Sequence, residues 1–264
     1  MSKLRISIRR CAPVSCCVLL LTSFPGLSVG QSTNSVADDE AKQRITGIIR
    51  ELDRSNYDAT IGAQELPVLE DAFAQTTDPV LKENIASALV RLGGKDDIYW
   101  SVLAERAQEI LDNDAPDPIL YDANGKSIRG KLSPAFLEWA SKHGLTSDAI
   151  YQQLLTIPAE FSFVATTGDS RGLPILRKGL QSSNYVIRAI AARGLATLQD
   201  EASIPLIIAA AHQAPSEIQG FIARALVAFS NPAAQAAAEE LVTDKNVLEG
   251  IRQQIKERGP RGVW

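Results

Sequence analysis

The chain has 264 residues, of which 45% are hydrophobic and only 6% aromatic, and its formal net charge is −4. This length can bury a sizeable core, and the hydrophobic fraction is ordinary for a globular protein, so wholesale disorder is excluded. Abundant Ala and Leu beside scarce aromatic residues favour closely packed helices over a β-sandwich.

The first thirty residues have the pattern of a secretory signal peptide. Four basic residues precede a mostly apolar run over 11–24, and Ser28 and Gly30 supply small side chains before a predicted cleavage at Gln31. The run is shorter than the roughly 20 apolar residues that span a bilayer. We therefore predict a signal peptide at 1–30, a linker at 31–38, and an exported product that is periplasmic or secreted.

Cleavage would also change what the mature chain can bind. It would remove all three cysteines (Cys11, Cys16 and Cys17) together with four positive charges, which takes the formal charge from −4 to −8. The mature chain would then have no thiol for a disulfide or a metal. A moderately acidic product is also a poor candidate for binding nucleic acid or an anionic membrane surface. No later stretch is long and apolar enough to cross a bilayer.

The first predicted helices follow the linker. Residues 39–54 form an amphipathic helix, Leu66-Pro67 opens a second, and 78–93 forms a third. The third contains the motif Asp78-Pro79-x-Leu81-Lys82-x-x-Ile85-Ala86-x-Ala88-Leu89-x-x-Leu92-Gly93. This motif resembles the second helix of a HEAT repeat, and is closest to the short variety shared with phycobilisome-lyase-type HEAT proteins. The resemblance covers roughly 60–95 and 170–258, and it implies a curved α-solenoid that binds proteins along one face, with no particular chemistry.

The middle of the chain departs from this pattern. After a predicted helix over 96–113, the segment 114–133 loses helical periodicity, and Asn124-Gly125 between two short β-prone runs indicates a hairpin. We interpret 114–133 as an insertion that projects from the solenoid and distinguishes this protein from a generic scaffold. Its candidate interaction residues are Tyr121, Asn124, Lys126 and Arg129. Helices are predicted to resume over 134–142 and 146–155.

A repeat with a spacing of 31 residues follows. Leu173-Pro174-Ile175-Leu176 aligns with Ile204-Pro205-Leu206-Ile207, and a third copy begins after Pro232. Further along the same two units, Ile187, Arg193, Leu195 and Leu198 align with Ile218, Arg224, Leu226 and Phe229. Each unit reads as two helices that cannot bury their apolar faces alone, so stacking is required. Gln199 and Ser230 stand where the HEAT class usually has Gly.

Two arginines recur in this register and are the remaining candidate interaction residues. Arg193 and Arg224 occupy equal positions in successive second helices, so they form either a hydrogen-bonded ladder between repeats or part of a binding surface. The last helix, with apolar Val247, Leu248 and Ile251 on one side, has the polar outer face of a terminal repeat. Residues 259–264 are interpreted as a tail.

An enzymatic alternative rests on Gly168-Asp169-Ser170-Arg171-Gly172. This stretch fits the G-x-S-x-G nucleophile elbow, follows the β-tolerant run 161–164, and has Asp200 and His212 downstream in the order of a serine hydrolase. An elbow needs a multi-stranded sheet beneath it, and no series of buried strands is predicted. The 31-residue register also explains the segment as the turn between two units. We therefore rank a hydrolase that uses Ser170 and His212 below the binding module.

Other chemical motifs are weaker. Gly125-Lys126-Ser127 lacks the preceding glycine of a P-loop, and a calcium loop starting at Asp122 would have Ser133 at the position of the bidentate Glu. His143 and His212 each lack a nearby second histidine or cysteine, so no metal or cofactor site is predicted. Adventitious Ca²⁺ binding is left open for the acidic residues before the hairpin, Asp112, Asp114, Asp117 and Asp122.

The sequence therefore predicts an all-α fold, an α-solenoid of antiparallel HEAT-like helix pairs over 39–258 with a small hairpin insertion. The expected function is that of a non-enzymatic scaffold that holds a protein partner on one solenoid face. The resemblance adds a further alternative, a lyase-like chaperone for a cofactor-bearing partner, which the exported, cysteine-poor context disfavours. The partner, the oligomeric state and the biological process are left open.

Overall fold

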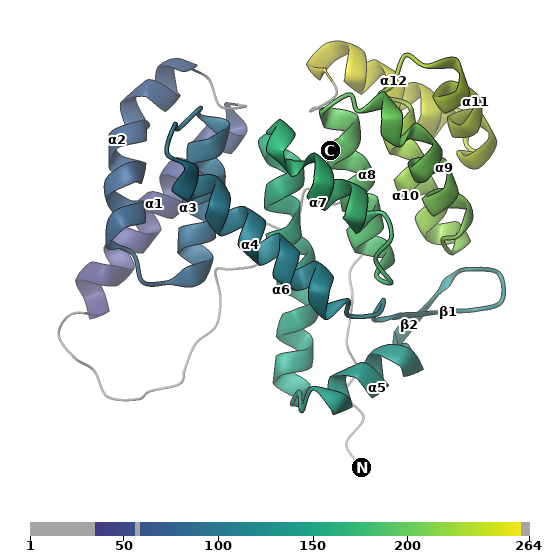
Figure 1. Ribbon diagram of the computed structural model, residues 1–264, viewed down its shortest axis with the longest axis horizontal. Coiled ribbons are helices and arrows are strands. Elements are labelled where there is room, and N and C mark those ends of the chain that lie inside the picture. Colours follow the sequence, from purple (N-terminus) through teal and green to yellow (C-terminus); the bar gives the residue numbers. More distant parts are fainter. Residues whose placement is uncertain (1–34, 56–58, 260–264) are drawn as a thin grey trace. The chain divides into compact units, whose positions relative to one another are not determined.

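The structure is a computed structural model that describes residues 35–55 and 59–259 (Figure 1). The predicted signal peptide at 1–30, the first part of the linker and the end of the predicted tail lie outside these residues. The described chain divides into two compact units, residues 35–106 and 107–259. Within them, no helix has the length and apolarity needed to cross a membrane.

The N-terminal unit is built from helices α1 (Ser35–Arg54), α2 (Ala59–Gln75) and α3 (Pro79–Arg91), and α4 (Asp97–Asn113) begins in it. Helices α1, α2 and α3 contact one another around a core formed by Leu52, Leu69, Ile85 and Leu89, all 0% exposed. Asp78 caps α3 by accepting hydrogen bonds from the backbone N–H groups of Val80 and Leu81 at 3.0 and 3.1 Å. The helix predicted over 78–93 is thus present, and the structure adds that Asp78 caps it and that Ile85 and Leu89 bury one side of it.

Two predicted boundaries in this unit were wrong. Helix α1 begins at Ser35, inside the predicted linker, and Pro67 lies within α2 instead of opening it. An internal proline breaks one helical hydrogen bond, which is why the local pattern favoured a start there. The burial of Leu69 and Phe73 on the same helix, with Phe73 packed edge-on against Tyr99 at 4.9 Å, supports the helix through that point.

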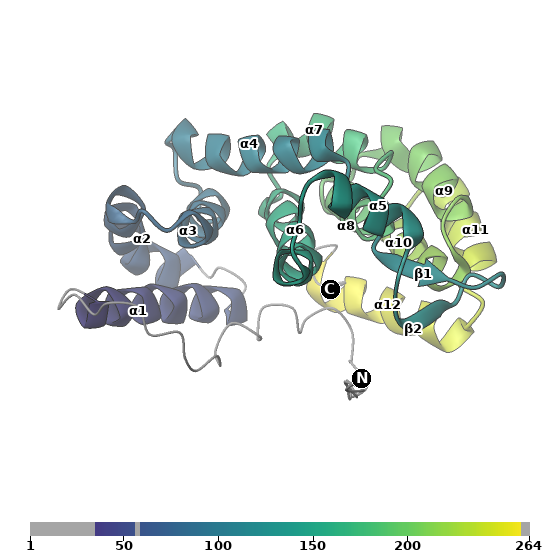
Figure 2. The ribbon, with the colours of Figure 1, turned by 90° about the horizontal axis from the view of Figure 1, so that it is seen from below.

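The C-terminal unit is two layers of helices plus a hairpin. Its helices are α5 (Pro134–Lys142), α6 (Ser147–Thr167), α7 (Leu173–Gly179), α8 (Tyr185–Thr197), α9 (Ile204–His212), α10 (Ser216–Leu226), α11 (Pro232–Leu241) and α12 (Lys245–Arg258). Helices α6, α8 and α10 pack in that order, α7 packs on α8, α9 packs on α10, and α11 contacts both α9 and α10. Figure 2 shows α7, α9 and α11 as one layer and α6, α8 and α10 as the other.

Burial confirms the 31-residue register. Leu176, Ile207 and Ala238 occupy the same position in α7, α9 and α11, and each is 0% exposed. In the other layer Leu195 and Leu226 are both 0% exposed, and 31 residues earlier Val164 in α6 is 1% exposed. The repeat therefore extends one second helix further towards the N-terminus than the sequence predicted.

Helix α6 is the main correction to the predicted elements. The sequence predicted a helix ending at 155 and a β-tolerant run over 161–164, but α6 continues unbroken to Thr167. Phe161 is 0% exposed, and it lies close enough to Gly179 of α7 that a Cβ there would come within 2.7 Å of the phenyl ring. β-Branched and aromatic residues suit a strand only when strands surround them, and here helices do.

Candidate functional site

The insertion forms a hairpin, as the sequence predicted, but with a different turn. Strands β1 (Ile119–Tyr121) and β2 (Ser127–Leu132) pair antiparallel in the only sheet found in the described residues. The Asp122 N–H donates to Lys126 O at 2.8 Å, and the Asp122 carboxylate accepts from the N–H groups of Asn124 and Lys126 at 2.8 and 2.9 Å. Gly125 has φ 71° and Asn124 does not have a positive φ, so this is a longer loop than a two-residue Asn-Gly turn.

Acidic side chains join the base of the insertion to the turn between α7 and α8. The Asp114 carboxylate accepts from the Ser183 N–H and hydroxyl, both at 3.0 Å. The Asp117 carboxylate is 6% exposed and accepts from the N–H groups of Ile119 at 2.8 Å and Tyr185 at 3.0 Å. Burial raises the pKa of Asp117, and these two backbone hydrogen bonds oppose that rise. The base of the insertion is thus fixed to the helix pair α7–α8, which is called the first repeat.

The acidic residues considered for calcium are therefore engaged in other contacts. Asp112 pairs with Lys178 of α7 at 2.6 Å, and that hydrogen bond lowers the pKa of Asp112. Asp114, Asp117 and Asp122 hold backbone groups, as described above. Across the described part of the chain, no cluster of three His, Cys, Asp or Glu side chains is arranged to hold a metal ion.

The tip of the hairpin rests on the start of α10, so the expectation that the insertion projects from the solenoid is wrong. The Ser216 hydroxyl donates to Asn124 O at 2.7 Å, and the Glu217 N–H donates to Gly125 O at 3.1 Å. In return, the Glu217 carboxylate accepts from the Ser127 N–H at 2.6 Å. Sequence alone missed this contact because residues 124 and 216 are far apart along the chain.

The candidate residues of the insertion consequently have unequal roles. Tyr121 packs edge-on against Tyr185, with ring centroids 6.0 Å apart, and its buried hydroxyl has no hydrogen-bond partner among the described residues. This burial raises the pKa of Tyr121. Asn124 contributes its backbone to the docked tip. Lys126 and Arg129 are exposed and carry positive charge that an acidic partner could reach on the insertion.

Arg193 and Arg224 lie at equal positions on the adjacent helices α8 and α10. Burial lowers the pKa of Arg193 to about 9. The Arg224 guanidinium lies 5.0 Å from the ring centroid of Phe221, a cation–π geometry, and Phe221 is 37% exposed. Both predicted interaction arginines are half-buried, and they differ in their surroundings: Arg224 lies beside the exposed Phe221 ring, whereas burial lowers the pKa of Arg193. Sequence analysis did not single out Phe221. The available indication was a bulky apolar residue 31 residues after Ile190, at the equivalent position of the repeat.

Helices α8 and α10 carry more positive than negative charge. Helix α8 carries Arg188 and Arg193 and no carboxylate, and Arg188 stacks over the Tyr185 ring at 5.1 Å. Helix α10 carries one carboxylate, that of Glu217, which is engaged by the hairpin, and one cation, Arg224. Helices α8 and α10 together therefore carry three guanidinium groups and one carboxylate, in a chain whose net charge is −4.

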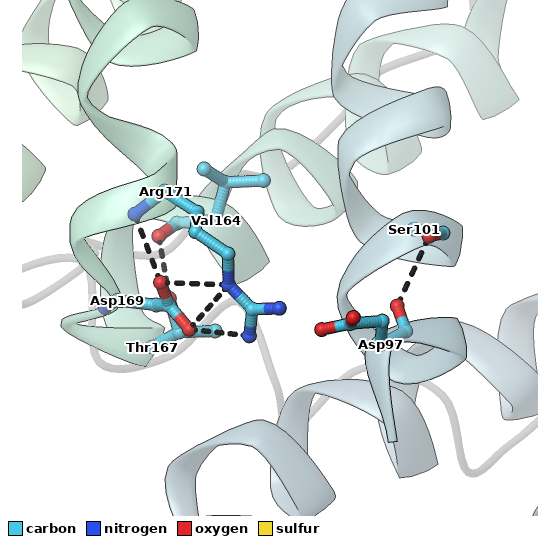
Figure 3. A network of polar contacts seen from close by, with 6 residues as sticks. All are labelled: Asp97, Ser101, Val164, Thr167, Asp169 and Arg171. Atoms are coloured by element: carbon cyan, nitrogen blue, oxygen red, sulfur yellow. Dashed lines mark hydrogen bonds and ion pairs between the residues drawn. The ribbon is translucent and has the colours of Figure 1, made fainter. Parts of the chain in front are cut away.

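The residues of the hydrolase alternative do not form a catalytic arrangement. Ser170 is an exposed residue of the 3₁₀ turn 170–172 between α6 and α7, so a helix and not a strand precedes it. Asp169 accepts from the backbone N–H of Arg171 at 2.9 Å and from its guanidinium at 2.7 Å, which lowers the pKa of Asp169 (Figure 3). Asp200 binds Arg177 at 2.7 and 2.9 Å, and His212 is exposed at the C-terminal end of α9.

Comparison with known proteins agrees with this geometry. Residues 173–256 match the family model for HEAT repeats. The match covers α7 to α12, the helices in which the 31-residue register was found. Apart from the hairpin, the described residues form an all-α, HEAT-like fold. No curated protein and no solved structure matches the chain.

Proposed function

We propose that the chain is a non-enzymatic scaffold that binds a protein partner on the face formed by α8 and α10. HEAT repeats generally serve in protein interaction and are generally not enzymes. The observation that supports this face most directly is the exposed Phe221 ring with the guanidinium of the half-buried Arg224 beside it. Aromatic residues and arginine are enriched where protein interfaces concentrate their binding energy.

The proposed partner surface is acidic. A carboxylate placed at Arg224 would gain a charge-assisted, bidentate hydrogen bond, and an apolar side chain could cover Phe221. Helix α8 offers no carboxylate that would compete for this arginine, and the single carboxylate of α10 is held by the hairpin. Exposed Lys126 and Arg129 on the hairpin extend the same charge.

Photo-crosslinking from single positions tests this assignment. A photoreactive amino acid is placed at Phe221 in cells that natively express the chain, and a matched control places it at Leu206. Leu206 is comparably exposed, at 41%, but lies on α9 in the other layer. We expect a defined protein adduct from position 221, loss of that adduct in an Arg224→Glu background, and no such adduct from position 206. An adduct from 206 alone, or one indifferent to Arg224→Glu, would contradict the proposed face.

We also propose that the mature chain is exported, on the basis of the basic and apolar pattern over 1–30. The test is N-terminal sequencing of the mature product and fractionation of the native cells. The expected mature N-terminus is Gln31 in the periplasm or the medium, and a variant lacking 2–30 is expected to remain inside the cell. An intact N-terminus on the native product would contradict export by cleavage.

A further inference from the structure

The hairpin touches the same position of two consecutive repeats. Its base binds the first repeat at Tyr185, whose N–H donates to Asp117. Its tip binds the second repeat at Ser216, which lies 31 residues further along and is the equivalent of Tyr185. The hairpin therefore spans one step of the solenoid, along the edge where the turn of each helix pair lies (Figure 1).

The second of these repeats lacks a cap that the first possesses. At the start of α8, the Asn184 side chain accepts from the N–H groups of Val186 and Ile187 at 2.9 and 3.3 Å. The equivalent residue before α10 is Pro215, whose side chain has no acceptor and makes no capping hydrogen bond. Since the first N–H groups of a helix have no partner within it, α10 needs an acceptor from elsewhere.

The hairpin tip supplies that acceptor. The Glu217 N–H, equivalent to the capped Val186 N–H of the first repeat, donates to Gly125 O. The fit leaves no space, because a Cβ at Gly125 would come within 2.4 Å of the Ser216 backbone nitrogen, and φ there is +71°. Glycine is thus required at this position by conformation and by contact.

We propose that the hairpin is a latch that caps α10 in place of its missing side-chain cap and fixes one repeat to the next. The base is held by the buried Asp117, whereas the tip is held by three polar contacts, two of them exposed and the third, between Glu217 and Gly125, half-buried. The tip is therefore the part that can release while the helix pairs stay folded. If α8 and α10 form the binding face, a step that rests on the proposed function, the closed latch sets the spacing of that face.

Amide hydrogen exchange in the full chain, followed by NMR, tests the latch without any partner, so its result is independent of the crosslinking result. Gly125→Ala should displace the tip and speed the exchange of the Glu217 and Ser127 amides by about tenfold or more. This factor corresponds to the net free energy of a typical hydrogen bond. The Val186 amide, capped by Asn184, is the internal control and should be unchanged.

Restoring the cap gives the decisive comparison. Pro215→Asn should return the side-chain acceptor that α8 has at the equivalent position, since Pro215 already has the extended backbone of an N-cap, φ −54° and ψ 147°. In Gly125→Ala with Pro215→Asn, we expect the Glu217 amide to regain its protection while Ser127 stays fast. Unchanged exchange in Gly125→Ala, or no recovery of Glu217 on adding Pro215→Asn, would overturn the proposal. If Gly125→Ala also releases Val186, the milder Ser216→Ala decides: faster exchange confined to Glu217 and Ser127 supports the latch, and unchanged exchange overturns it.

Discussion

At the scale of single residues, the close approach of the solenoid's helices limits the size of the side chains that fit between them. Gly194 of α8 lies against α6 and α7, and a Cβ there would come within 2.7 Å of the Leu176 side chain and 2.9 Å of the Ala165 Cα. The equivalent residue of the next repeat is Ala225, which is buried at 4% exposure. The same position thus accepts a methyl group in one repeat and excludes it in the other.

Gly194→Ala should therefore destabilise the protein, although Ala is the better helix former. Helix propensity alone would stabilise by about 1 kcal/mol, whereas overpacking against a backbone atom costs about 1–3 kcal/mol. We expect the clash to win because the Ala165 Cα cannot rotate away. Chemical denaturation measures the change, with Ala225→Gly as the matched control, which should cost the propensity difference together with the loss of one buried methyl group. A Gly194→Ala variant that is more stable than the parent would show that the backbone of α6 can shift to accommodate the added methyl group.

The candidate residues show what sequence can resolve at this scale. The register placed Arg193 and Arg224 at equal positions, and the structure agrees, but the side chains around them differ, since Arg224 lies over the Phe221 ring. The mismatch between Asn184 and Pro215 was visible in the same alignment and signals a missing cap. What replaces the cap could not be deduced, because Gly125 meets Ser216 only through the tertiary fold.

At the scale of elements, the turns between helix pairs repeat at 31 residues with different chemistry. Asp169, Asp200 and Asn231 are equivalent: Asp169 binds Arg171 of its own turn, and Asn231 caps α11 through the Ala233 N–H at 2.9 Å. Asp200 instead reaches back to Arg177 of α7 and also accepts from the Ser203 hydroxyl. The Asp200 carboxylate therefore connects one repeat to the preceding one.

This connection should make stability depend on pH. The hydrogen bond from Arg177 holds the pKa of Asp200 below its usual value of 3.8. A folded-state pKa below the unfolded one gives stability that is present above the unfolded value and is lost as the pH falls through the folded value. We expect Asp200→Asn to lower the melting temperature at pH 7, and the difference from the parent to shrink as the pH falls towards 3.

Arg177→Gln is the partner control for that measurement. It should weaken the pH dependence in the same way, and adding it to Asp200→Asn should change the melting temperature little, because both variants remove the same pair. A difference between parent and Asp200→Asn that persists undiminished at pH 3 would mean that the carboxylate charge does not carry the effect.

At the scale of the whole molecule, stability should be distributed along the repeats. Each helix pair contacts its neighbours in sequence: α6 with α8, α8 with α10, and α10 with α11. In such a stack, the effect of a local defect depends on how many neighbours the damaged unit has. Leu248 of the last helix, 4% exposed, and Leu195 of the central α8, 0% exposed, allow the two situations to be compared.

Leu248→Ala and Leu195→Ala should both destabilise the C-terminal unit, but they should differ in which helices show faster amide exchange. Each removes a buried side chain at a cost of about 2–5 kcal/mol. For Leu248→Ala we expect faster amide exchange in α10 to α12 with α6 and α8 unchanged, whereas Leu195→Ala should accelerate exchange from α6 through α10. Exchange that rises uniformly over residues 107–259 in both variants would mean that this unit unfolds all or none.

The sequence by itself determined the helical class, the 31-residue step and most helix boundaries. These depend on apolar spacing and capping residues, such as Asp78 before α3, that act within a few residues of themselves. Tertiary structure decided three features: the continuation of α6 through the run 161–164, the exposure of the Phe221 ring beside Arg224, and the docking of the hairpin on α10. The physical reason is that each feature depends on which residues distant in the chain contact the segment concerned. The local preferences of that segment were ambiguous or favoured another structure.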